Sequence, residues 1–203
     1  FERGVALGKE GQFVWADRPV SGKVADAAAA LDRPLPSEGE YVSELNLAGR
    51  AWIAEWAERL EKGAMLLVDY GYPRAEYYLD SRSTGTLLCY FRHHAHGDPF
   101  LWPGLNDITA FVDFTAAAEA GFAAGLDILG YTDQANLLFN CGVLACLARR
   151  APEDSVDYIR AAKAVQRLTG PHEMGELFKV IAMGRGIEQP LIGFLRGDRL
   201  HAL

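Results

Sequence analysis

The spacing of hydrophobic and polar positions changes several times along the chain, and each spacing predicts a different element. Apolar residues alternate on both sides of a polar turn within residues 3–16, which predicts a β-hairpin. Within residues 47–61, apolar residues recur every three or four positions, which predicts an amphipathic helix that stops at Gly63. Residues 64–68 are then apolar without interruption, as expected for a parallel strand with both faces covered.

The remainder of the chain predicts further helices and strands. A proline- and alanine-rich stretch, residues 19–40, has a short helix as its only regular element, at 25–31. Residues 72–111 form a long aromatic connection with one candidate strand, at 85–90. We then expect helices at 114–124, 134–149 and 154–168, and strands at 126–131, 177–183 and 191–195.

Polar residues and glycines mark the ends of several of these helices. Asp113 is the expected N-cap of the alanine-rich helix, and Gly125 its stop. Asp154 or Ser155 can cap the last helix. Alternating helices and strands predict an α/β fold, a doubly wound sheet with an antiparallel edge strand.

Composition narrows the classes of function. The 203 residues carry a formal net charge of −7, which argues against nucleic-acid binding, and one domain is the default at this length. No apolar run reaches the length of a membrane-spanning helix, so we expect no membrane span. The three cysteines lack metal-ligand spacing and are interpreted as buried thiols in a reducing compartment. The chain starts at Phe1 and shows no signal peptide.

The clearest candidate site follows the buried strand. Asp69, Tyr70 and Gly71 stand at its carboxyl end, where open α/β sheets bind ligands. The alternative is a strand-end turn in which Asp69 bonds local amides.

The long connection supplies the second set of candidates. His93 and His96 suit a general base or a substrate contact, whereas they can equally satisfy backbone groups, and we expect His94 to face solvent. These histidines have no partner at metal-ligand spacing, so no metal site is predicted. Asp107 follows a rigid Pro-Gly turn and is the better functional candidate, whereas capping explains Asp113. The aromatic residues of this stretch form either a substrate channel or a small core of their own.

Three strings carry a family resemblance: residues 63–71 (GAMLLVDYG), residues 85–114 with GTLLCY and PGLNDITAFVDF, and residues 130–134 (GYTDQ) with Phe139 and Gly142 after them. Together they resemble the MidA-like family of class I S-adenosyl-L-methionine (SAM) dependent methyltransferases. The resemblance covers residues 1 to about 195. It implies the C-terminal part of a Rossmann-like sheet, with residues 64–68 as its fifth strand and residues 72–111 as an inserted substrate-side loop.

The resemblance also implies an activity and a site. One mitochondrial member is a protein-arginine methyltransferase that assists respiratory complex I assembly. Transfer to a guanidinium needs alignment with the methyl donor, carboxylates for the charge and a base for the proton. The implied roles are cofactor binding for Asp69, Tyr70 and Gly71, catalysis for His93, His96 and Asp107, and substrate binding for Glu44, Thr109 and Asp113.

One family feature has no counterpart in these residues. The glycine-rich SAM loop of the family would lie before residue 1, and Gly8–Gly11 is turn material that does not open a helix. We therefore expect a fragment of a methyltransferase domain, with SAM as the cofactor of the complete protein and a protein as substrate. A missing N-terminal half or a homodimer would complete it. The compartment would be cytoplasmic, or mitochondrial in a eukaryote. The alternative is a non-catalytic module for interaction or assembly.

Overall fold

A computed structural model describes residues 1–31, 39–150 and 155–203. Two compact units make up the chain, and each is described by itself. The first comprises residues 1–47 and 78–110, and the second comprises residues 48–77 and 111–203. In the described part of the chain, no helix is long and apolar enough to cross a bilayer.

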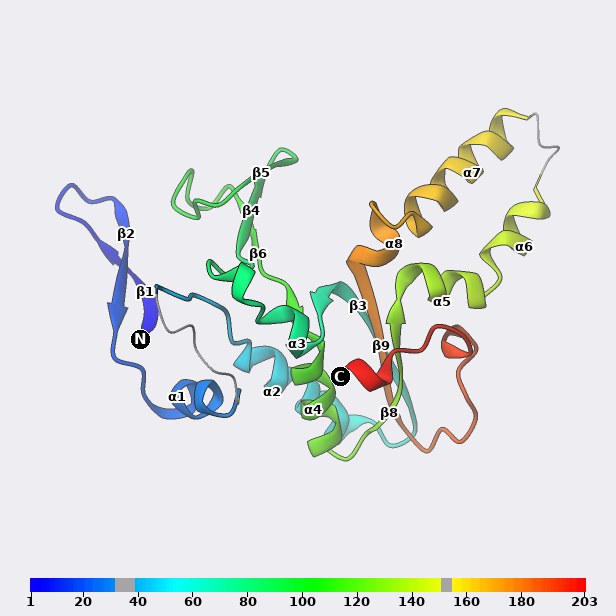
Figure 1. Cartoon of the computed structure of the whole chain (residues 1–203), viewed down its shortest axis with the longest axis horizontal. Coiled ribbons are helices and arrows are strands. Elements are labelled where there is room, and N and C mark those ends of the chain that lie inside the picture. Colours follow the sequence, from blue (N-terminus) through cyan, green and yellow to red (C-terminus); the bar gives the residue numbers. More distant parts are fainter. Residues whose placement is uncertain (32–38, 151–154) are drawn as a thin grey trace. The chain divides into compact units, whose positions relative to one another are not determined.

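The second unit is built on a four-stranded sheet (Figure 1). Its strands, in spatial order, are β7 (Val112–Asp113), β3 (Gly63–Tyr72), β9 (Phe178–Arg185) and β8 (Asp127–Asp133). The antiparallel member is β9, which pairs with β3 on one side and β8 on the other. The strands β3 and β8 consequently run in the same direction, and their carboxyl ends meet at one edge of the sheet.

The second unit also contains helices and 3-10 turns, some of which cover the sheet. They are α2 (Leu47–Arg59), α3 (Arg74–Tyr77), α4 (Phe114–Ala123), α5 (Gln134–Asn140), α6 (Val143–Ala148), α7 (Val156–Thr169) and α8 (Met174–Leu177), with 3-10 turns η2 (Ile192–Phe194) and η3 (Leu200–Ala202). The expected caps are confirmed, because Asp113 accepts from the Ala116 amide at 3.0 Å and Ser155 from the Tyr158 amide at 3.1 Å. Asp154 lies outside the described residues.

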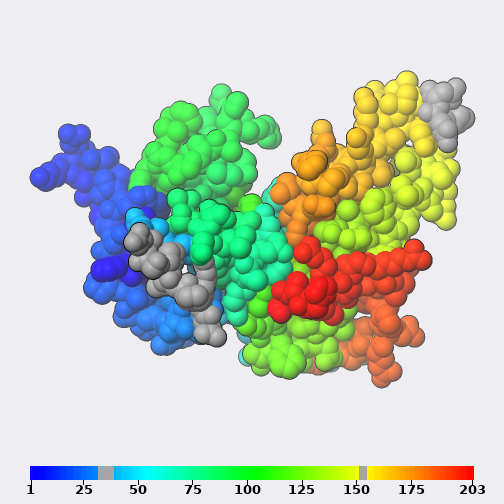
Figure 2. Space-filling model, viewed as in Figure 1, coloured from blue at the N-terminus to red at the C-terminus, as the bar shows by residue number. Residues whose placement is uncertain are grey.

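Two apolar clusters cover opposite faces of the sheet. Ile53 and Ala57 of α2 join Phe114 of α4 on one face, against Ile181 and Met183 of β9. On the other face, Val180 and Ala182 pack with Phe194, Leu137 and Leu191. The C-terminal segment, red in Figure 2, lies against α5, where Asn140 donates to the carbonyl oxygens of Gly193 and Arg196.

The first unit contains two small sheets. The predicted hairpin is confirmed as β1 (Glu2–Leu7) and β2 (Phe13–Arg18), and α1 (Gly22–Ala29) follows it. The second sheet has the order β5-β4-β6, with β4 (Leu88–Phe91), β5 (His94–His96) and β6 (Asp107–Thr109). The 3-10 turn η1 (Asp80–Arg82) precedes it. The stretch at 72–111 is thus more regular than the sequence suggests.

Several predictions were wrong in detail. The helix expected at 134–149 is broken at Gly142, which has φ +82° and is the N-cap of α6. Residues 191–195 form no strand and contain the 3-10 turn η2 (Ile192–Phe194) instead. Of the three cysteines, Cys89 is buried, whereas Cys141 and Cys146 are exposed. The strand at 64–68 is covered on one face only, because Leu66 and Val68 on its other face are exposed.

Candidate functional site

Asp69 and Tyr70 occupy the carboxyl end of β3, as expected. The Asp69 carboxylate is exposed and accepts from the Tyr70 amide at 2.8 Å. The Tyr70 ring packs on Phe178 with centroids 4.0 Å apart and stacks on Phe111 at 6.1 Å. The strand end and the aromatic contacts together hold a carboxylate and a phenol ring at the end of the sheet where open α/β folds generally bind ligands.

Gly71 is required by packing. A Cβ on this residue would lie 2.2 Å from the Val112 carbonyl oxygen and 2.8 Å from the Phe114 ring. Gly71 therefore lets β7 and α4 approach β3 closely, which fixes the position of the neighbouring Asp69 and Tyr70 backbone.

A row of charged residues at this edge was not predicted from the sequence. Lys179 is paired in register with Asp69 of β3 on one side and with Asp133 of β8 on the other. Directly opposed residues on neighbouring strands point to the same face, so a lysine stands between two aspartates. The signal was present in the sequence as one lysine inside an otherwise apolar strand.

Lys179 is unusual because only 5% of it is exposed. Its ammonium group donates to the Glu176 carbonyl oxygen and lies 5.7 Å from the centroid of the Tyr72 ring. Burial lowers the pKa of Lys179 below its usual range, with a further decrease from Arg199. Asp133, also buried, caps α5 by accepting from the Asn136 amide at 2.8 Å.

The hydroxyl of Tyr131 in β8 is buried without a hydrogen-bond partner among the described residues. Burial raises the pKa of Tyr131. The strand that carries Asp133 of the charged row therefore also carries a second buried polar group, the Tyr131 hydroxyl.

Asp113 lies beside β3 because it pairs in register with Tyr72. Its second carboxylate oxygen lies 3.7 Å from Nε of Arg74, and the guanidinium of Arg74 also donates to Glu119 at 2.7 Å. Burial raises the pKa of Asp113, whereas the hydrogen bond from Arg74 lowers the pKa of Glu119. Capping and ion pairing account for these contacts of Asp113.

Glu44 organises the start of the three-stranded sheet in the first unit. Its carboxylate accepts from the Thr86 amide at 2.9 Å, the Thr86 hydroxyl at 3.0 Å and the Leu87 amide at 3.0 Å. These bonds hold the segment that leads into β4.

His93 lies at the tip of the β4–β5 hairpin. Arg92 and His93 have φ values of +48° and +67°, the combination of a two-residue type I′ turn. Such a turn favours asparagine and glycine, so two larger residues make it strained. His93 and His94 are both exposed, which confirms the expectation for His94.

His96, Asp107 and Thr109 lie on the two strands that flank β4 in this small sheet, with His96 on one face and Asp107 and Thr109 on the other. His96 pairs with Cys89, and Asp107 pairs with Tyr90. The His96 ring contacts Asn106 through Nε2 at 3.2 Å, whereas its buried Nδ1 has no partner among the described residues. Thr109 pairs with Leu88.

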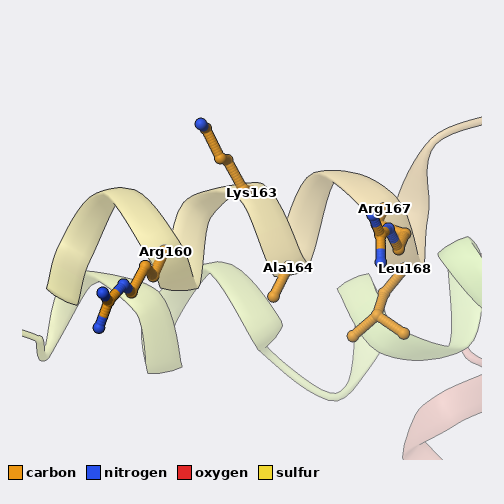
Figure 3. A pocket seen from close by; sticks show the side chains of 5 residues that line it. All are labelled: Arg160, Lys163, Ala164, Arg167 and Leu168. Carbon is orange, nitrogen blue, oxygen red and sulfur yellow. The ribbon is translucent and has the colours of Figure 1, made fainter. Parts of the chain in front are cut away.

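A separate pocket of about 460 Å³ lies along α7. Figure 3 shows Ala164 and Leu168 directed towards the neighbouring helices and Lys163 directed away from them. Arg160 and Arg167 complete the lining. None of the residues predicted from the sequence contributes to it. Over the described residues, no group of three or more metal-ligating side chains is found.

Comparison with known proteins decides which family this arrangement belongs to. The model of the family described as "Putative S-adenosyl-L-methionine-dependent methyltransferase" matches residues 1–132. The chain belongs to this MidA-like methyltransferase family. Over 179 residues it is 31% identical to "Protein arginine methyltransferase NDUFAF7 homolog, mitochondrial" of Drosophila melanogaster, which covers 82% of this chain and 38% of that protein. The rat protein arginine methyltransferase NDUFAF7, also mitochondrial, is 31% identical over 64% of this chain and 29% of its own length.

Two solved structures of relatives share more sequence identity with this chain than the Drosophila and rat proteins do. A protein from Burkholderia thailandensis is 50% identical, with a TM-score of 0.92 over 99% of this chain and 53% of that one. A structure from the same superfamily and organism, bound to S-adenosyl-homocysteine, is 48% identical with a TM-score of 0.92, over 99% of this chain and 51% of that one. The predicted α/β methyltransferase fold is confirmed. The chain spans about two fifths of the Drosophila relative and about half of the solved structures.

Proposed function

We propose that this chain is part of a SAM-dependent methyltransferase that methylates an arginine side chain of a protein. The match to the methyltransferase family model over residues 1–132 carries the proposal. The arginine acceptor rests on the Drosophila and rat relatives, whose names specify it. From the same resemblance we propose a role in complex I assembly for a mitochondrial member, and a cytoplasmic or mitochondrial compartment.

The proposed reaction needs a donor side and an acceptor side. SAM, when bound, supplies a methyl group on a sulfonium sulfur. The acceptor nitrogen forms its bond to this carbon as the carbon–sulfur bond breaks, and the methylated guanidinium then gives up one proton. Residues of the chain have to align the acceptor, balance its charge and take that proton.

Asp69, Tyr70 and Gly71 are proposed for the donor side. An exposed carboxylate accepts hydrogen bonds from hydroxyl groups, and an aromatic ring packs on a flat heterocycle, so Asp69 and Tyr70 fit the nucleoside part of SAM. Gly71 would act by shaping the strand end. Gly8–Gly11 lies in the turn between β1 and β2 and opens no helix, so it is not proposed as a glycine-rich SAM loop. Asp69, Tyr70 and Gly71 are therefore proposed to form only one side of the donor site.

The acceptor side is proposed to lie on the small sheet of the first unit. His93 or His96 would take the proton, and Asp107 would balance charge. Glu44 would act through the Thr86 segment that it holds, with Thr109 as a further substrate contact. Asp113, which belongs to the second unit, is proposed separately as a substrate contact. His96 is favoured over His93 because one ring nitrogen is already oriented by Asn106.

The test uses the full-length protein that contains these residues. Calorimetry with S-adenosyl-homocysteine should show binding, and Asp69→Asn should weaken it about tenfold, which corresponds to the loss of one charge-assisted hydrogen bond. Radiolabelled methyl transfer to an arginine peptide should exceed transfer to its lysine counterpart. His96→Gln should lower kcat without changing affinity for the nucleoside. Absence of nucleoside binding would remove the catalytic proposal and favour the non-catalytic assembly module.

A further inference from the structure

The outward face of α7 carries three cations without an ion-pair partner. Arg160, Lys163 and Arg167 are all exposed, and their spacings of three, four and seven residues place them on one side of the helix. Among the described residues, no carboxylate lies within ion-pairing distance of any of the three. Other arginines of the chain are ion-paired, namely Arg3, Arg18, Arg59, Arg74 and Arg199.

The stability of α7 does not explain these charges. Like charges three and four residues apart repel one another, which weakens a helix. The helix dipole favours Arg167, which lies in the last turn, but gives no such support to Arg160 in the first half. The chain as a whole has a net charge of −7, yet residues 143–150 and 155–169 hold five cations and one acid. Positive charge is therefore concentrated on α6 and α7 of an acidic protein.

The pocket along α7 lies among these charges. Ala164 and Leu168 line it and point towards the neighbouring helices, whereas Lys163 points away (Figure 3). Arg160 and Arg167 line it as well, and their backbone positions are about 10 Å apart along the helix axis. The lining therefore combines an apolar part with guanidinium groups two helical turns apart.

We infer that this face of α7 binds an acidic segment of a partner protein, with carboxylates on Arg160 and Arg167 and an apolar side chain in the pocket. Guanidinium groups bind carboxylates through paired hydrogen bonds. Carboxylates about 10 Å apart belong to residues seven apart on a helix, or three apart on an extended chain. Lys163, on the outer side of α7, adds attraction at longer range.

Other anions fit this face less well. Two separated guanidinium groups suit two separate carboxylates better than a single phosphate. A nucleic acid would bring many phosphates, which the net charge of −7 repels, and its backbone would make no use of the apolar part of the pocket. The inference goes beyond the proposed function, because none of these residues is assigned to methyl transfer.

The experiment selects peptides on the full-length protein that contains these residues. From a random peptide display library, we expect enrichment of sequences in which two acidic residues, three or seven positions apart, enclose an apolar one. A synthetic peptide of the selected sequence should bind about tenfold more weakly to the double variant Arg160→Glu, Arg167→Glu. The matched control is Lys9→Glu, Lys23→Glu, which changes the net charge equally at two exposed cations of the first unit.

A single substitution separates binding from folding. Lys163→Glu places a carboxylate three residues after Arg160 and four before Arg167, where it can pair with both within the helix. The thermal midpoint of unfolding should therefore not fall, whereas the selected peptide should bind about tenfold more weakly, because both arginines are already engaged. Lys163→Gln removes the positive charge without this pairing and should weaken binding less.

Three results would overturn the inference: selection of peptides without acidic residues, equal losses in the double variant and its control, or unchanged peptide binding by Lys163→Glu. Binding of a single-stranded oligonucleotide without binding of any acidic peptide would assign the surface to nucleic acid instead. A second copy of the chain that occupies α7 and is not displaced by the peptide would also contradict it. None of these measurements uses SAM, so loss of nucleoside binding would count against the proposed function alone.

Discussion

The ammonium group of Lys179 lies 5.7 Å from the centroid of the Tyr72 ring, inside the sheet edge where β3 and β8 end. Burial lowers the pKa of Lys179 from its usual 10.5. Between the lowered pKa and 10.5, the unfolded chain binds more protons than the folded one, so stability rises with pH there. The charge therefore lowers stability at neutral pH.

Lys179→Met should raise the free energy of unfolding at pH 7 by on the order of 1 kcal/mol, because a buried charge is replaced by an apolar chain of similar length. The gain should shrink towards pH 10. Urea unfolding at both pH values measures it, with the exposed Lys163→Met as control. An equal loss of stability at both pH values would show that the contacts of Lys179 outweigh its desolvation. Methyl transfer by Lys179→Met is measured in a separate assay.

Asp113 combines a helix cap with a raised pKa, and two variants separate these effects. Asp113→Ala should cost about 1 kcal/mol, because the Ala116 amide loses its acceptor. Asp113→Asn keeps an acceptor and cannot ionise. Since the folded pKa lies above 3.8, the stability of the wild type falls as pH rises through that window. The asparagine variant should accordingly gain on the wild type from pH 3.5 to 7. Equal losses for both variants would contradict this account.

Gly71→Ala should destabilise the protein by about 1–3 kcal/mol, because its Cβ would lie 2.2 Å from a backbone oxygen that cannot rotate away. Gly97→Ala is the matched control. A Cβ added at Gly97 would meet only open space, so this variant should change little. Thermal unfolding compares the two variants. A neutral Gly71→Ala would mean that β7 can separate from β3 at low cost.

The strained tip of the β4–β5 hairpin offers a test of His93. Replacing Arg92 and His93 by asparagine and glycine should stabilise the hairpin by about 1 kcal/mol, since this pair favours the type I′ turn. His94→Gly, next to the tip, should not stabilise it. If His93 is the base, the same double variant loses methyl transfer at unchanged nucleoside affinity. Retained transfer would leave His96 as the candidate.

Local patterns predicted most elements, because hydrophobic spacing and caps act within a few residues. The helix at 47–61 was predicted from its apolar spacing, and Asp113 was identified as a cap from its place before an alanine-rich run. The two-residue turn at Arg92 and His93 lacks the usual glycine, so the hairpin beyond residue 90 went unrecognised.

By itself, the sequence determined the hairpin, the alternation of helices and strands, and the strand end at Asp69 and Tyr70, because each follows from contacts between near neighbours. Only the tertiary structure decided that Lys179 stands between Asp69 and Asp133, and that Leu66 and Val68 lie uncovered. Strand order and register bring together residues far apart in the chain. Burial, which lowers the pKa of Lys179, is a property of that arrangement.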